Sequence, residues 1–445
     1  MAEFDAAIDR AERALAFARA AGASEAEATC TAARRFSAEA RDRTLTKLEQ
    51  SSGRSCTVRV FVDGAKATLA TTDLTDEGLH AAIGRVVDAA RRVAPDPLAG
   101  LPEPSRFEPV DLAIESADVL ARTAEAKIED ALGLERVARA ADERIVNSGG
   151  SRIGDTVVAV ALANSRGLRG EYRATAASRM TSPIAADGER KRTASYGTAA
   201  RGYAALEPVE QVAGIAARRA VQMCGARRPP TMRVPVIFER DVAAAVLSDI
   251  FASLSAANVA VGNSFLLDRV GDRIGSEAVT VIDDGRLRGG LGSAPFDAEG
   301  VPTRRTVVFD RGVLRSYLCD TYHGRRLGLA STANASPGGG VGANNLFLGP
   351  GTAKLADLIA QTKRGVFVLE TIGFATENVT GTYSRGASGF FIENGELAYP
   401  IDEFTIAGNL ATMLAGIDGV ADDLVFDGSI VAPSFRVAEM TVSGS

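Results

Sequence analysis

One stretch, residues 234–284, constrains the fold most because it predicts a buried helix directly behind a strand. Residues 233–238 are a short apolar run with β-branched members, which is typical of a strand. The run from Asp241 to Leu254 is rich in alanine and leucine and predicts a helix, with Asp241 as the cap of its first turn. Apolar residues recur in this run every four positions and predict one buried face: Val242, Val246, Ile250 and Leu254.

The same predicted helix lacks the side chains that hold transition metals. It contains no histidine and no cysteine, and its only acid beyond Asp241 is Asp249. Zinc in proteins is held by cysteine, histidine and acidic side chains acting together. We therefore do not expect this helix to provide a metal site.

Length, charge and cysteine usage indicate the broad class of the protein. The 445 residues carry a net charge of −6, which argues against direct binding of nucleic acid. The sequence shows no secretory signal and no run of eighteen apolar residues, so no membrane span is expected. The cysteines lie far apart without a CxxC motif and predict buried, reduced thiols in the cytoplasm. They are Cys30, Cys56, Cys224 and Cys319.

The best boundary in the chain lies at residues 225–230, where a glycine, two arginines and a double proline follow one another. We divide the chain there into an N-terminal α+β domain, 1–225, and a strand-rich C-terminal domain, 226–445. Strands and helices do not alternate as they do in βαβ units. The predicted fold class is therefore α+β, with mixed or antiparallel sheets and helices.

Local patterns predict individual elements. Residues 44–49 and 55–62 predict two separate strands, and residues 117–141 predict a helix that is broken near Gly133. Two dipeptides give the clearest hairpin signals: Asp63-Gly64 and Asn394-Gly395.

Two stretches of the second half carry side chains that resemble ligands. The glycine-rich run 338–345 lacks the lysine of a P-loop, so a flexible loop or lid is favoured over phosphate binding. A set of acidic side chains could hold a divalent cation, but it lacks the calcium-loop spacing, and a solvated turn is favoured. These acids are Asp283, Asp284, Asp297 and Glu299.

His323 is one of two histidines in the chain and could act as a general base. Asp320 is its nearest acid in the sequence, and Cys319 is a possible nucleophile. Residues this close in sequence rarely form a catalytic triad, so catalysis at His323 is disfavoured.

Several longer motifs resemble signatures of the TldD/PmbA family. They keep the family's order and span nearly the whole chain. In the first half, residues 163–167 look like the family's asparagine-glycine turn. The second half contributes 296–306, 318–322, 333–335, 383–386, 392–395 and 406–410.

The resemblance implies one of two kinds of subunit. The TldD kind looks like a metallopeptidase with an HExxxH helix, and the PmbA kind, also called TldE, lacks this motif and pairs with the first kind. The motif's His, Glu and His align here with Leu247, Ser248 and Ala252. Leucine and alanine side chains cannot coordinate a metal. The chain therefore resembles the PmbA kind, with no cofactor of its own and with zinc expected only in the partner subunit.

The resemblance implies that the chain is a non-catalytic partner subunit of a TldD/TldE-type zinc metallopeptidase complex. This complex would act on unfolded peptides. The partner would be a TldD-type subunit or a second copy of the chain. Asn344, Tyr383 and Arg385 are the predicted peptide contacts. One alternative is a homodimeric regulator of DNA gyrase or of an antitoxin, without protease activity. Another is a cysteine or serine hydrolase that uses His323.

Overall fold

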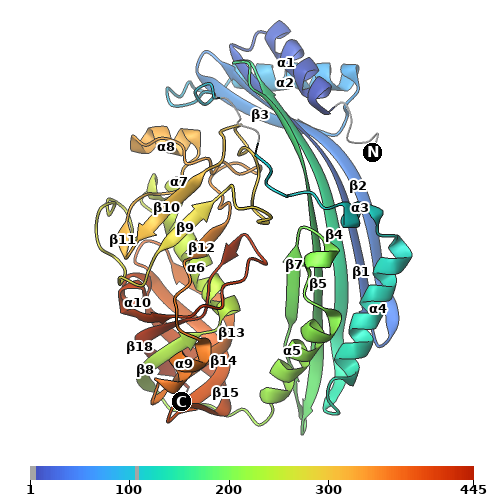
Figure 1. The fold of residues 1–445 in the computed structure, drawn as a ribbon. Coiled ribbons are helices and arrows are strands. Elements are labelled where there is room, and N and C mark those ends of the chain that lie inside the picture. Colours follow the sequence, from blue (N-terminus) through green and yellow to red (C-terminus); the bar gives the residue numbers. More distant parts are fainter. Residues whose placement is uncertain (1–6, 106–109, 445) are drawn as a thin grey trace.

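In the computed structural model, which describes residues 7–105 and 110–444, the first half is built on one long sheet (Figure 1). Its strand order is β3-β2-β1-β4-β5-β6, β7 also pairs with β5, and every pairing is antiparallel. Four of its strands are 17 to 20 residues long. The strands are β1 (Glu25–Arg41), β2 (Thr44–Val62), β3 (Ala65–Thr71), β4 (Ile145–Asn164), β5 (Arg169–Asp187), β6 (Arg190–Thr193) and β7 (Tyr196–Ala200).

Helices cover one face of this sheet. Buried residues recur at alternate positions along most of β1, which gives the sheet an apolar face. Helices α1 and α2 pack on one end of that face, and α4 and α5 pack on the other end. The opposite face is turned toward the second half of the chain (Figure 1). The helices of this half are α1 (Ala7–Ala20), α2 (Asp76–Ala90), α3 (Ala117–Ala121), α4 (Ala124–Ala140) and α5 (Val209–Gln222).

The second half contains a closed barrel and a smaller sheet. The barrel has the order β15-β14-β13-β8-β18 and closes because β15 pairs with β18, while β16 adds to β18. The smaller sheet has the order β11-β10-β9-β12-β17. The barrel strands are β8 (Met232–Phe238), β13 (Arg364–Glu377), β14 (Thr382–Glu393), β15 (Glu396–Asn409), β16 (Ile417–Val420) and β18 (Phe435–Ser443). The others are β9 (Val281–Asp284), β10 (Arg305–Asp310), β11 (Val313–Leu314), β12 (Leu346–Leu348) and β17 (Ile430–Val431).

The predicted helix behind the first strand of this half is α6 (Arg240–Leu254). Its four-residue apolar stripe is buried as predicted, and α6 packs against β8, β12, β13 and β17. The predicted cap is wrong by two positions, because the side chain of Glu239 accepts the N–H of Asp241 at 2.8 Å. Four short helices complete this half: α7 (Ala256–Val259), α8 (Thr321–Leu327), α9 (Leu355–Ala360) and α10 (Leu410–Gly416).

The α+β fold class and both hairpin turns are confirmed. Asp63 and Gly64 have φ values of 50° and 83°, and Asn394 and Gly395 have values of 53° and 82°. These left-handed conformations are the ones that tight hairpins require and that Asn, Asp and Gly tolerate best. A membrane-spanning helix is not found among the described residues.

Two local predictions are wrong. The strands predicted at 44–49 and 55–62 are one continuous strand, β2, because its pairing with β1 continues through the polar residues between them. The helix predicted at 117–141 breaks at residues 122–123, where Thr123 accepts the N–H of Ala126 and starts α4, and Gly133 lies inside that helix. The division of the chain at residue 225 stays a prediction; α5 ends shortly before it and β8 begins shortly after it.

Candidate functional site

The three positions aligned with a metal motif lie on different sides of α6. Leu247 is 4% exposed and packs in the core with Val281 and Met413, while Ser248 is exposed and Ala252 is half-buried. No group of three or more His, Cys, Asp or Glu side chains in the described part of the chain is arranged to hold a metal ion. The residues present at this helix therefore do not fit zinc.

The polar side of α6 carries an ion pair with Arg385, one of the predicted peptide contacts, and Tyr383, another of them, lies beside it. Arg385 on β14 donates from Nη2 to both carboxylate oxygens of Asp249, at 2.7 Å each. The guanidinium carbon lies 5.8 Å from the centre of the Tyr383 ring. Tyr383 is 1% exposed, and burial raises the pKa of its hydroxyl. In this conformation the Tyr383 ring belongs to the core, and Arg385 is the more accessible of the two.

Asn344, the third predicted contact, lies in a separate cluster around Asp283. Its backbone N–H donates to Asp283 Oδ1 at 2.9 Å and its side chain donates to Oδ2 at 3.0 Å. Asn334 donates to the same Oδ2 at 2.8 Å. Burial raises the pKa of Asp283 to about 6, although these hydrogen bonds favour its charged form. The three residues predicted to contact peptide therefore do not form a single cluster, and their role in peptide binding stays a prediction.

The solvated turn predicted for the acidic residues is wrong for Asp283, Asp297 and Glu299, which are 0%, 7% and 6% exposed. Asp297 accepts the backbone N–H groups of residues 299, 301 and 335, at 2.9 to 3.0 Å, and so organises the loops around it. Burial raises the pKa of Asp297 to about 7. These carboxylates are internal acceptors, because distant segments fold over them and supply donors.

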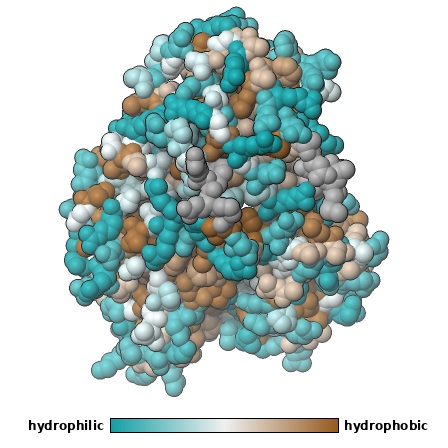
Figure 2. Space-filling view, turned by 45° about the horizontal axis from the view of Figure 1, so that its top comes forward, coloured by the Kyte–Doolittle hydropathy of each residue, from teal (hydrophilic) through white to brown (hydrophobic). Residues whose placement is uncertain are grey.

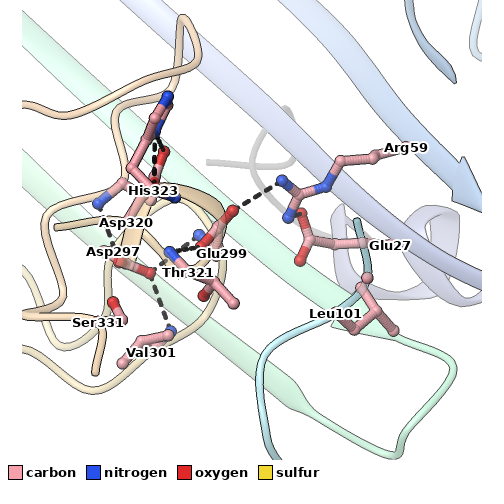
Figure 3. Close-up of polar contacts among 12 residues, drawn as sticks. Glu27, Arg59, Leu101, Asp297, Glu299, Val301, Asp320, Thr321, His323 and Ser331 are labelled. Atoms are coloured by element: carbon pink, nitrogen blue, oxygen red, sulfur yellow. Dashed lines mark hydrogen bonds and ion pairs between the residues drawn. The ribbon is translucent and has the colours of Figure 1, made fainter. Parts of the chain in front are cut away.

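Glu299 also joins the two halves of the chain (Figure 3). Arg59 on β2 donates to Glu299 at 2.9 Å and to Glu27 on β1 at 2.8 Å. Glu299 accepts in addition the N–H of Thr321 at 2.8 Å. Burial raises the pKa of Glu27 to about 7, and the charge of Arg59 opposes that rise. We call Glu27, Arg59 and Glu299 the bridging triad; sequence reasoning missed it because Glu299 lies 240 positions from Arg59 in the chain.

The side chain of His323 serves a local structural role. Its Nδ1 lies 2.9 Å from each oxygen of Asp320, and its backbone N–H donates to Asp320 at 2.7 Å, so Asp320 caps α8. Burial raises the pKa of the Cys319 thiol to about 12, which disfavours the thiolate a nucleophile needs. Among the contacts of the described residues, none joins Cys319 Sγ to His323. The geometry does not support a Cys-His site here.

Strand β2 presents a long free edge. Within the described residues, 44–55 pair with β1 on one side, and β3 joins the other side only from Cys56 onward. The edge is exposed and includes Leu45 and Leu48, which are 39% and 51% exposed. Beside it lies a groove on the sheet, lined in part by Arg35, Gln50, Thr156 and Ser178. An uncovered edge of this length offers backbone donors and acceptors to another chain.

Figure 2 shows hydrophilic residues over much of the face it presents, with hydrophobic residues in separate groups and a hollow between the two halves at its lower edge. Single exposed apolar residues are normal on a soluble surface. The free edge of β2 is therefore the most distinctive feature that the described surface offers to a partner.

Comparison with known proteins gives the family. Residues 26–94, 118–223 and 231–444 match, in this order, domain 1, the central domain and the C-terminal domain of the PmbA/TldA metallopeptidases. The chain is 32% identical over 429 residues to a Metalloprotease PmbA homolog of Haemophilus influenzae, which covers 96% of this chain and 93% of the relative. It is 32% identical over 403 residues to Metalloprotease PmbA of Escherichia coli O157:H7, covering 89% and 87%.

Solved structures agree with this match. A Bacteroides thetaiotaomicron protein described as a candidate modulator of DNA gyrase has a TM-score of 0.91 and 27% identity, over 98% of each chain. TldE of Thermococcus kodakarensis shares the fold, with a TM-score of 0.90 and 22% identity over 98% of this chain and 100% of that one. The sequence motifs, the fold and these matches agree: the chain belongs to the PmbA/TldD metallopeptidase family.

Proposed function

We propose that this chain is the subunit of a TldD/TldE-type peptidase complex that does not itself hold the catalytic zinc. The observation that carries the proposal is the apolar setting of α6. Leu247 stands at an aligned ligand position and packs among Val281, Leu348 and Met413. A zinc peptidase needs nitrogen, sulfur or carboxylate ligands around the metal and an open position for water. A core of this kind provides neither.

The proposed partner is a family member that carries the metal motif. The free edge of β2 supports this pairing, because residues 44–55 leave a row of backbone groups without a strand neighbour among the described residues. The barrel of the second half is closed and offers few edges of this kind. Pairing across the β2 edge would extend the first sheet into the partner.

The proposed substrate is an unfolded peptide held between the subunits. An extended chain is recognised through its backbone when it lies along a sheet, and such recognition tolerates many side chains. The groove beside the β2 edge is lined mostly by small or polar residues, which suits this mode. Arg385 and Asn344 remain the proposed contacts in the second half, with Tyr383 behind Arg385. The complex would act in the cytoplasm.

Co-expression with a motif-bearing family member from the same genome tests the proposal. We expect cleavage of an unstructured peptide by the two chains together, loss of cleavage with a chelator, and metal analysis that finds zinc in the partner. This chain alone is expected to be inactive. Zinc-dependent cleavage by this chain alone would reject the assignment.

Substitution at the free edge tests the proposed interface. We expect Leu45→Lys with Leu48→Lys to weaken the complex about tenfold or more, because two apolar contacts are lost and two charges are added next to Lys47. Both leucines are exposed, so the variant should fold as the parent does. Leu397→Lys on β15, at a leucine that is 41% exposed, is the matched control and should bind normally. Sedimentation with purified partner measures complex formation by each variant. A double variant that binds no more weakly than Leu397→Lys would place the interface elsewhere.

The alternative is a homodimeric regulator without protease activity, in line with the name of the Bacteroides neighbour. The same sedimentation experiment separates the two functions. A stable homodimer that ignores the motif-bearing relative would favour the regulator. A heterodimer would favour the peptidase complex.

A further inference from the structure

The sheet of the first half brings two distant thiols into contact. Cys30 on β1 and Cys56 on β2 occupy directly opposite positions of the antiparallel pair, so their side chains point to the same face. The Cys30 thiol donates to Cys56 Sγ at 2.8 Å. The two residues are 2% and 0% exposed, beneath α1 and α2.

The geometry is close to that of a disulfide. Opposite residues of an antiparallel pair have Cα atoms about 4.5 to 5.5 Å apart, and disulfides span Cα distances of about 4.4 to 6.8 Å. The sulfur atoms, at 2.8 Å, need to approach by less than 1 Å to reach the S–S bond length of about 2.05 Å. Neither backbone has to move far, because the sulfur atoms already lie this close, and both strands are held by neighbours on both sides at this position.

We propose that Cys30 and Cys56 form a reversible intrachain disulfide by exchange with a small-molecule disulfide such as glutathione disulfide. One thiol loses its proton, and the thiolate attacks the glutathione disulfide and releases one glutathione thiolate. The second cysteine, also as thiolate, then attacks the protein sulfur of the mixed disulfide and releases the other glutathione. The two protein thiols are oxidised, one glutathione disulfide is reduced to two glutathiones, and the two protons pass to the released thiolates.

Burial sets the conditions under which this reaction runs. The hydrogen bond with Cys30 and the apolar surroundings raise the pKa of Cys56, so little reactive thiolate is present in the closed fold. The reaction therefore depends on transient opening of α1 and α2 over the sheet. Once formed, the bond holds β1 to β2 at the point where β2 gains β3 as its outer neighbour, immediately next to the free edge.

Thiol counting in glutathione redox buffers tests the proposal. The purified full chain is equilibrated at a series of disulfide-to-thiol ratios, with mild urea to speed opening, then denatured and alkylated, and its intact mass is measured. We expect the four alkylatable thiols to fall to two, and the oxidised fraction to follow glutathione disulfide divided by the square of glutathione. A digest without reductant should contain the peptide that links Cys30 to Cys56. The thermal midpoint of the oxidised chain should be several degrees higher, because the bond closes a loop between residues 26 positions apart.

Two variants serve as a matched pair. Cys224→Ala, at the half-buried cysteine, should still lose two thiols, and Cys30→Ala should lose none. The linked peptide in the parent chain decides the matter independently if Cys30→Ala folds poorly. Four free thiols at the most oxidising ratio, or glutathione adducts in place of the linked peptide, would overturn the proposal.

Discussion

Replacing Arg59 by alanine is expected to lower the free energy of unfolding by about 3 to 5 kcal/mol at pH 8, because it leaves two buried carboxylates without their cation. The side chains of Glu27 and Glu299 are 5% and 7% exposed, and Arg59 is itself 18% exposed. Glu299 keeps the N–H of Thr321, but Glu27 loses the partner that offsets its burial. Urea unfolding monitored by circular dichroism measures the loss.

The loss of stability caused by Arg59→Ala should be smaller in mild acid, because Glu27 then takes up a proton. Burial raises its pKa in the folded chain from 4.5 to about 7, so the folded state holds a proton that the unfolded state releases. The stabilisation that comes from this bound proton is fully present below pH 4.5 and is lost as the pH rises through 7. At pH 5.5 Glu27 is mostly protonated in the folded chain, so Arg59→Ala then leaves mainly Glu299 without its cation. Equal losses at pH 5.5 and pH 8 would contradict this account.

The exposed pair of Arg152 and Glu39 on the same sheet gives the control. Arg152 is 53% exposed and lies 2.6 Å from Glu39. Surface pairs of this kind contribute about 1 kcal/mol or less. Arg152→Ala is therefore expected to change stability little at either pH.

Leu247→His is expected to destabilise the chain by about 3 kcal/mol or more, because it removes a buried leucine and places a polar ring in an apolar core. Ser248→Ala, at the next position, should change stability by less than about 0.5 kcal/mol, since Ser248 is exposed. The two positions are adjacent on one helix, one on its buried face and one on its exposed face. Thermal and urea unfolding of both variants measure the contrast.

Metal analysis extends this second prediction. The triple variant Leu247→His, Ser248→Glu, Ala252→His restores the motif letters but not the geometry, because side chains five apart lie about 140° apart around a regular helix. We expect no stoichiometric zinc in it. Tight zinc binding without loss of stability would show that the space around Leu247 is a preformed metal pocket.

The sequence predicts those features that depend on the conformational preferences of neighbouring residues. The Asn394-Gly395 and Asp63-Gly64 turns and the stripe of α6 follow from backbone preference and periodicity, and the structure has them. The continuity of β2 could not be predicted, because residues 50–54 are four polar residues and a glycine that are held in the strand by β1. Their conformation depends on a neighbour, not on their own propensity.

The bridging triad shows the same limit. A hairpin centred on residues 42–43 places Glu27 opposite Arg59, so that contact was open to sequence reasoning. Glu299 lies 240 positions from Arg59, and no local pattern joins them. Without those donors, the sequence around Glu299 predicts a solvated turn. The same holds for Asp283, whose partners Asn334 and Asn344 come from two other loops.

The candidate site was predictable only as a pattern of residue types. Alignment placed Leu247, Ser248 and Ala252 on one helix, and the structure does so. It did not reveal that Asp249 holds Arg385, since that pair joins α6 to a strand 136 positions away. The side-chain directions that separate a core leucine from an exposed serine also depended on the packing of β12, β17 and α10.

Closure of the barrel between β15 and β18 has a consequence for folding kinetics. Strand β8 has neighbours on both sides only after β13 and β18 have formed, and both are distant from it in sequence. Pairings between strands so distant in sequence slow folding, because the chain loses the entropy of closing a large loop before the stabilising contacts form. A chain stopped before Phe435 would leave β8 and β15 each with one unpaired edge, so partial products of synthesis should aggregate far more readily than the finished protein.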